Sequence, residues 1–283
     1  MTPAVFDATP CTLGEGPLWH PERGSLFWFD ILGKTLRGEE NIWHFDEHVS
    51  AAGWVTHDSL LIASETALQL FDIDTGASEL VCDLESDELI TRSNDGRADP
   101  YGGFWIGTMG KNAEAQAGAI YRYYKGELRQ LFPSLTITNA ICFSPDGLYA
   151  YFTDTPTKII MRQALDTKDG WPKGAPEPWL DLNGEGVNPD GAVIDAAGNF
   201  WNAQWGAHRV ACYGSDGAFK TAITLPAEQI SCPAFGGTNL FDLYATSAAV
   251  GLSADALKAH LENGMTFVIP GVGKGQAEHR VLL

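Results

Sequence analysis

Residues 92–109 read R-S-N-D-G-R-A-D-P-Y-G-G-F-W-I-G-T-M. The first half has the composition of a polar turn, with Arg92, Asn94 and Asp95 close to Gly96. The second half begins after the turn D-P-Y-G and predicts a short apolar strand around Trp105. If the same unit recurs along the chain, the repeat identifies the fold before any single motif is interpreted.

Strand cores similar to F-W-I at 104–106 recur throughout the sequence. Their central residues follow one another in steps of 34 to 49 residues: Trp28, Ile62, Trp105, Phe152, Trp201 and Tyr244. Most of these cores follow a turn such as S-P-D-G at 144–147. Repeats of about 40–45 residues with four short strands each are typical of a β-propeller. We therefore predict an all-β fold, a six-bladed propeller that occupies residues 1–283 as a single domain.

Other segments predict the remaining elements of the blades. Alternating or apolar runs predict further strands at 67–73, 119–124 and 158–163. One short helix is expected in the C-terminal region, over 253–263, with Ser253 as its N-cap and Gly264 as its stop. We expect the ring to be closed by pairing among residues 4–8, 266–269 and 279–283.

Composition restricts the classes of partner. The net charge of −18 repels phosphate backbones and anionic lipid, so we expect binding to neither nucleic acid nor membranes. The 5 cysteines are scattered without a C-x-x-C pair, which is typical of reduced thiols. The N-terminus resembles no signal peptide, and no apolar run is long enough to span a membrane. We expect a cytoplasmic protein, a monomer or weak homo-oligomer, that acts on a small molecule.

The repeat also predicts where a site should lie. Counting back 11 to 13 residues from four of the anchors reaches Glu15, Asn94, Asn139 and Asp190, each near the start of the innermost strand of its blade. In a propeller these positions converge on the central channel. Two carboxylates and two amides offer only oxygen donors, which suit one hard divalent cation. We expect Ca²⁺, while Zn²⁺, Mn²⁺ or Mg²⁺ also fit such a set.

Several motifs together resemble the SMP-30/gluconolactonase/regucalcin family. They occur in the family's order: G-E-G-P-L-W at 14–19, R-S-N-D-G-R-A-D-P at 92–100, G-T-M at 107–109, T-N-A-I-C-F-S-P-D-G at 138–147 and P-D-G-A-V-I-D-A-A-G-N-F-W at 189–201. The resemblance extends from Leu13 to about Ser247. It implies a six-bladed propeller that hydrolyses sugar lactones with a divalent metal ion.

The resemblance also implies individual roles. By motif, the metal ligands would be Glu15, Asn139 and Asp190, and the substrate-binding residues would be Arg92, Asn94 and Glu114. This chain departs from the family pattern in having Ser93 where proline is frequent. It also has W-G-A-H at 205–208 where W-G-G is common, so His208 could influence substrate preference or could be a surface residue.

These residues together support one mechanism. Lactone hydrolysis needs a polarised carbonyl group and a water molecule at the carbonyl carbon, and a divalent ion can supply both. Asp190 is the predicted general base, and Arg92 would stabilise the developing negative charge. Two other classes remain open. One is a propeller esterase or paraoxonase-like lactonase acting on non-sugar substrates, and the other is a non-catalytic calcium-binding regulatory protein. No G-x-S-x-G elbow or G-x-x-x-x-G-K-[ST] loop is present.

Overall fold

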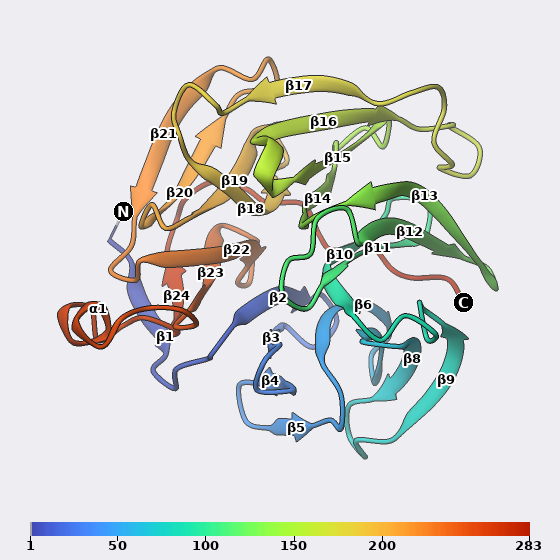
Figure 1. The fold of residues 1–283 in the computed structure, drawn as a ribbon, viewed down its shortest axis with the longest axis horizontal. Helices are drawn as coiled ribbons and strands as arrows, with labels where there is room; N and C mark the ends of the chain where they lie inside the picture. The colour runs from blue at the N-terminus through green and yellow to red at the C-terminus, as the bar shows by residue number, and fades with distance from the viewer. Residues whose placement is uncertain (1) are drawn as a thin grey trace.

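The fold consists of six four-stranded sheets, arranged as blades around a central channel, and the computed structural model describes residues 2–283 (Figure 1). The first three blades are β2 (Gly14–His20), β3 (Ser25–Asp30), β4 (Thr35–Gly38) and β5 (Ile42–His44); β6 (Val49–Thr56), β7 (Ser59–Ser64), β8 (Ala67–Asp72) and β9 (Ser78–Asp83); and β10 (Thr91–Ala98), β11 (Phe104–Gly110), β12 (Gly118–Tyr124) and β13 (Glu127–Leu135). The next two are β14 (Thr138–Phe143), β15 (Tyr149–Asp154), β16 (Ile159–Ala164) and β17 (Glu177–Asp181); and β18 (Asn188–Ile194), β19 (Phe200–Trp205), β20 (Arg209–Tyr213) and β21 (Phe219–Thr224). The sixth combines β22 (Gln229–Gly236), β23 (Asp242–Ala248), β24 (Thr266–Ile269) and the N-terminal β1 (Ala4–Asp7).

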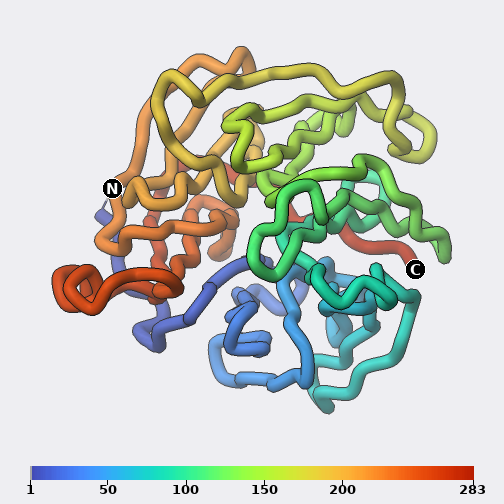
Figure 2. Tube along the Cα trace, viewed as in Figure 1, coloured from blue at the N-terminus to red at the C-terminus, as the bar shows by residue number. Residues whose placement is uncertain are grey.

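The predicted all-β, six-bladed propeller is confirmed. Each predicted strand core lies in the second strand of a blade, namely β3, β7, β11, β15, β19 and β23. The chain passes once around the ring in sequence order (Figure 2). The polar half of residues 92–109 is a strand, β10, and not a turn. Its backbone pairs antiparallel with β11, and its buried polar side chains hydrogen-bond one another inside the protein.

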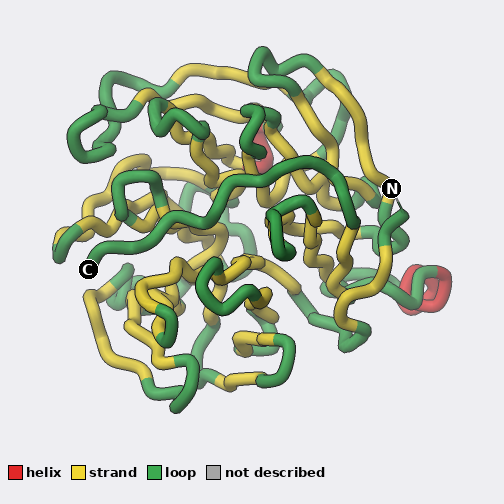
Figure 3. The backbone as a smooth tube through the Cα atoms, turned by 180° about the vertical axis from the view of Figure 1, so that it is seen from behind, coloured by secondary structure: helices red, strands yellow, loops and turns green. Residues whose placement is uncertain are grey.

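The ring is closed by the two ends of the sixth blade. β1 pairs antiparallel with β24, with Val5 opposite Phe267, as the sequence predicted. The pairing expected for residues 279–283 is wrong, because this segment forms no strand. Residues 275–283, which we call the C-terminal strap, instead cross the face seen from behind in Figure 3. There the Leu282 amide donates to the Gly102 carbonyl oxygen at 2.8 Å, and Val281 is buried.

The one α-helix of the described residues is shorter than predicted. α1 spans Ala254–Ala259, and its N-cap is Ser253, whose hydroxyl accepts a hydrogen bond from the Ala256 amide. The helix ends at Ala259, where the backbone of the next residue, His260, becomes extended with φ −128° and ψ 91°. Within residues 2–283, no helix is long and apolar enough to cross a membrane.

Apolar side chains pack mainly between neighbouring blades. Trp105 of the third blade is fully buried and meets the Phe143 ring of the fourth at 5.6 Å, edge to face. Phe132 stacks on Phe152 across the same boundary at 4.5 Å. Each such ring contributes about 1.5–3 kcal/mol by leaving water. These contacts hold the blades at fixed positions, so the innermost strands present their side chains to the channel from defined directions.

Candidate active site

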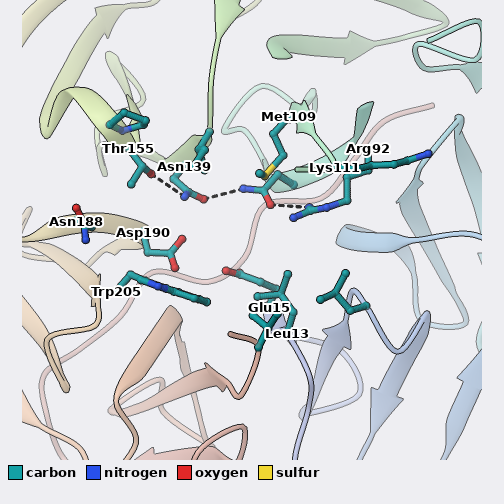
Figure 4. A pocket seen from close by; sticks show the side chains of 15 residues that line it. Leu13, Glu15, Arg92, Met109, Lys111, Asn139, Thr155, Asn188, Asp190 and Trp205 are labelled. Carbon is teal, nitrogen blue, oxygen red and sulfur yellow. Dashed lines mark hydrogen bonds between the residues drawn. The ribbon is translucent and has the colours of Figure 1, made fainter. Parts of the chain in front are cut away.

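The predicted site residues lie at equivalent places in four innermost strands. Each of these strands has a register shift, or β-bulge, at or next to the site residue: at 15–18 in β2, 93–96 in β10, 139–142 in β14 and 189–192 in β18. A bulge locally twists the strand and redirects a side chain. It brings Glu15, Asn94, Asn139 and Asp190 to one end of the channel (Figure 4).

Two of these residues are followed by left-handed backbone. Gly16 has φ +52°, and a Cβ atom there would lie only 2.2 Å from the Ser50 carbonyl oxygen. The G-E-G-P motif therefore needs glycine at this position. Ala140, after Asn139, also has φ 59° and is fully buried, although it is not glycine. Such conformations are costly, and they persist only where surrounding contacts hold them.

A cavity of about 560 Å³ opens above these four side chains. Its polar lining consists of Glu15, Arg92, Asn94, Lys111, Asn139, Thr155, Asn188 and Asp190. Its apolar lining consists of Leu13, Leu32, Met109, Ile137, Pro156, Trp205 and Val250. In Figure 4 the carboxylates of Glu15 and Asp190 face each other across the cavity, with the Asn139 amide nearby. The structure therefore brings the three predicted metal ligands and two predicted substrate-binding residues, Arg92 and Asn94, into one cavity.

The carboxylates of the cavity are held in an environment that disfavours their charge. Burial raises the pKa of Glu15 to about 8, and the negative charge of Asp95 adds to this shift. Burial also raises the pKa of Asp190 well above its ordinary value, with Glu15 as the next cause. Asp95, directly after Asn94 in β10, has its pKa raised to about 6 by burial. Removing acids from water has this effect, and the nearby positive charges of Arg92 and Arg97 offset only part of it.

Two buried guanidinium groups lie in the same channel. Arg92 faces the cavity, and burial lowers its pKa to about 10. Arg97 forms a buried ion pair with Glu278 of the C-terminal strap, at the other end of β10. When all are ionised, the four buried carboxylates (Glu15, Asp95, Asp190 and Glu278) and the two guanidinium groups sum to a charge of −2. This is the charge that one divalent cation would neutralise.

Hydrogen bonds connect the residues predicted to bind substrate to those predicted to bind a metal ion (Figure 4). Arg92 Nη1 donates to Asn94 Oδ1 at 2.8 Å. Asn94 Nδ2 donates to Asn139 Oδ1 at 3.1 Å. Asn139 Nδ2 donates to Thr155 Oγ1 at 2.9 Å. On the far side, Asn202 Nδ2 donates to the carbonyl oxygen of Asp190 at 3.0 Å and so holds the bulged backbone of β18.

Comparison with known proteins identifies the family. The family sequence model described as the SMP-30/gluconolactonase/LRE-like region matches residues 13–249. The chain belongs to this family. It is 40% identical to a putative sugar lactone lactonase of Rhizobium meliloti, over 94% of this chain and 92% of that protein. It is 36% identical to the L-arabinolactonase of Azospirillum brasilense, over 95% and 92%. The solved structure of a calcium-binding regucalcin from Agrobacterium tumefaciens superposes with a TM-score of 0.96 at 41% identity, covering 99% of this chain and 97% of that one.

Glu114, which the family resemblance implied as a substrate-binding residue, is not among the residues that line the cavity. Glu114 belongs to the loop between β11 and β12, and its carboxylate accepts hydrogen bonds from the Asn112 amide at 3.0 Å and from Asn112 Nδ2 at 2.9 Å. Lys111, from the same loop, lines the cavity instead, and its ammonium group pairs with Glu65. The loop therefore contributes Lys111 to the cavity lining, where the sequence predicted Glu114.

The two departures from the common family pattern have different surroundings. Ser93 is fully buried, and its hydroxyl accepts a hydrogen bond from Ser50 Oγ at 2.8 Å. His208 is not among the cavity residues, and its ring lies 4.9 Å from that of His260. His208 therefore contacts the segment after α1 and has no place in the cavity lining.

The sequence reasoning missed further cavity residues. Lys111, Thr155 and Trp205 each follow the core of a second strand by a few residues, at the end of β11, β15 or β19 that meets the cavity. Asn188 begins β18, two residues before Asp190. Counting forward from each anchor, as well as back, would have pointed to the first three.

Proposed function

We propose that this chain hydrolyses a sugar lactone to the open-chain sugar acid, with a divalent cation held by Glu15, Asn139 and Asp190. The observation that carries the proposal is the buried set of oxygen donors at one bulge position of four blades, in a channel whose buried groups carry an uncompensated charge of −2 when ionised. Membership of the family supports the lactone, since the relatives include the L-arabinolactonase and, at 31% identity, a 6-deoxy-6-sulfogluconolactonase of Pseudomonas putida.

The residues present fit a hard cation. Carboxylate and amide oxygens suit Ca²⁺, Mg²⁺ and Mn²⁺, and they also accommodate Zn²⁺. A cation between Glu15 and Asp190 would offset the mutual repulsion that helps raise the pKa of Asp190. We favour Ca²⁺, because the similar regucalcin from Agrobacterium tumefaciens is a calcium-binding protein. When bound, the cation would supply carbonyl polarisation and a lowered pKa for water.

The side chains provide the remaining chemistry. Asp190 accepts a proton from the water molecule that attacks the lactone carbonyl carbon. The ester bond between that carbon and the ring oxygen then breaks, and Asp190 returns the proton to the departing ring oxygen, which becomes a hydroxyl group. Arg92 stabilises the charge that develops on the carbonyl oxygen. Within the described residues only its Nη1 is engaged, by Ser93 and Asn94, so its other nitrogen atoms are available to substrate.

The test is hydrolysis of a panel of aldono- and aldarolactones, with and without a chelator. Asp190→Ala is expected to lower kcat/KM by about 10²–10⁴-fold, the usual contribution of a general base. Asp216→Asn, which changes an exposed carboxylate in a turn, is the control and should leave kcat/KM unchanged. If Asp190→Ala retained more than about a tenth of the activity, the role of Asp190 would be wrong. Full activity after removal of all divalent ions would refute the metal site.

The apolar lining favours a second candidate, a propeller lactonase or esterase acting on less polar substrates. The side chains of Trp205, Val250 and Leu32 form part of the cavity wall, and none of them carries a hydrogen-bond acceptor for a sugar hydroxyl. Sugar lactones and acyl-chain lactones should therefore be compared in the same panel. Higher kcat/KM for the acyl-chain lactones would establish this alternative. Divalent-ion binding without turnover of any lactone would indicate a regulatory binding protein.

A further inference from the structure

A chain of four hydrogen bonds crosses three blades at the cavity floor. It starts at Arg92 in β10, passes through Asn94 and Asn139, and reaches Thr155 at 2.8, 3.1 and 2.9 Å. The fourth bond runs from Thr155 Oγ1 to the Pro189 carbonyl oxygen at 2.8 Å. Pro189 directly precedes Asp190 in β18. One hydroxyl therefore contacts both the amide of one proposed metal ligand and the backbone next to another.

The direction of this chain is fixed at both ends. Arg92 can only donate, so the Asn94 atom that faces it must be the oxygen. The Pro189 carbonyl can only accept, so the Thr155 hydroxyl must donate its one proton to it. Toward Asn139 the hydroxyl can therefore act only as an acceptor, so the Asn139 atom that faces it is the nitrogen. Asn94 Nδ2 has a further acceptor, the Thr138 carbonyl oxygen at 2.9 Å. Both amide nitrogens are thus committed as donors, and each amide oxygen keeps one lone pair for a cation or a substrate hydroxyl.

The backbone holds Thr155 in position for this role. Thr155 follows β15 and begins the short 3₁₀ helix η1 (Thr155–Thr157), with Pro156 as its second residue. The Thr155 amide donates to the Ile137 carbonyl oxygen at 2.9 Å, and the Lys158 amide donates to the Thr155 carbonyl oxygen at 3.0 Å. The hydroxyl is therefore directed between β14 and β18 by main-chain contacts as well as by its own hydrogen bonds.

We propose that Thr155 is a positioning residue whose hydroxyl fixes Asn139 and the Pro189–Asp190 backbone so that their oxygen atoms face the cation. The inference rests on the proposed metal site and concerns how that site is held. Removing the hydroxyl leaves Asn139 Nδ2 and the Pro189 carbonyl oxygen each without its partner. Partners that orient ligands in this way typically contribute about 10–100-fold to metal affinity.

The experiment is a calorimetric Ca²⁺ titration of the chelator-treated protein without lactone. Thr155→Val keeps the branched shape and removes the hydroxyl, and it is expected to weaken Ca²⁺ binding by about 10–100-fold. Thr155→Ser restores the hydroxyl and should bind within about threefold of the wild-type protein, because the same hydrogen bonds can form. Thr157→Val is the matched control, since the Thr157 hydroxyl of the same short helix donates to the Asp154 carbonyl oxygen and accepts from the Ile159 amide, and neither is a proposed metal ligand.

The outcomes separate the possible failures. Unchanged affinity in Thr155→Val would overturn the role of Thr155, and equal losses in Thr155→Val and Thr155→Ser would show that shape rather than the hydroxyl matters. Thermal unfolding checks that each variant folds, and Thr155→Ala replaces the valine variant if that one does not. If the wild-type protein bound no divalent ion, the proposed function itself would fall, and the role of Thr155 with it.

Discussion

Stability of the metal-free protein should decrease as the pH rises from 6.5 to 8. The cause is Glu15, whose pKa is raised by burial from 4.5 to about 8. In the unfolded chain this carboxyl group loses its proton near pH 4.5, whereas the folded protein retains it up to about pH 8. The folded state therefore binds more protons across this interval, and each increase in pH favours the unfolded state.

The expected magnitude follows from the linkage between proton binding and folding. From pH 6.5 to 8, Glu15 alone should reduce the free energy of unfolding by about 1.5 kcal/mol. Asp190, whose pKa is also raised by burial, acts in the same direction. The buried His20 and the partly buried His279 have lowered pKa values, through removal from water, so they act in the opposite direction. Their effect is largest at low pH and fades above about pH 6.5, where an unfolded histidine loses its proton, so it offsets part of the Glu15 effect only at the lower end of this interval.

Urea unfolding at four pH values between 6.5 and 8, with chelator present, measures the slope. Glu15→Gln should reduce it, because glutamine does not titrate, while Asp216→Asn should leave it unchanged. Ca²⁺ at a fixed concentration of about 100 times its Kd at pH 8 should add about 2.7 kcal/mol at that pH. Since cation binding requires ionised carboxylates, the same concentration should add less at pH 6.5. Stability that is constant or rising with pH in the metal-free protein would refute the electrostatic account of Glu15.

Other parts of the structure make separate predictions. Glu278→Gln should lower the free energy of unfolding by about 3 kcal/mol, because it leaves Arg97 buried without its carboxylate; its control, Glu127→Gln, alters a pair whose side chains are about half exposed and should cost below about 1 kcal/mol. Equal losses for these two variants in urea unfolding would contradict the burial argument. Ala140→Val should cost about 1–3 kcal/mol in the same assay, because a branched side chain is placed at φ 59°, whereas Ala140→Gly should be tolerated. Glu114→Ala should change kcat/KM by no more than about twofold, since the Glu114 carboxylate already accepts two hydrogen bonds from Asn112. A tenfold loss would instead establish the substrate-binding role that the family resemblance implies.

The sequence determined the architecture because a propeller repeats a local pattern. Strand cores around Trp28, Trp105 and Trp201 recur at blade spacing, and burial of large apolar side chains between blades is what each repeat needs. The same spacing placed Glu15 and Asp190 at one end of the channel, since equivalent positions of equivalent strands converge there. Local periodicity was therefore sufficient for the fold and for bringing the predicted metal ligands together.

Tertiary structure alone decided the contacts between distant residues. The C-terminal strap meets β10 through Arg97 and Glu278, 181 residues apart, and nothing in either segment specifies the other. Whether Glu114 faces the cavity depends on the conformation of the loop between β11 and β12, and this loop is not part of the repeated strand pattern. The position of Thr155 between Asn139 and Pro189 depends on how three separate segments pack. A hydrogen bond is lost when the donor–acceptor distance changes by a few tenths of an ångström or when the angle is poor. Distance and angle are set by the packing of the whole ring and not by the spacing of residues along the chain.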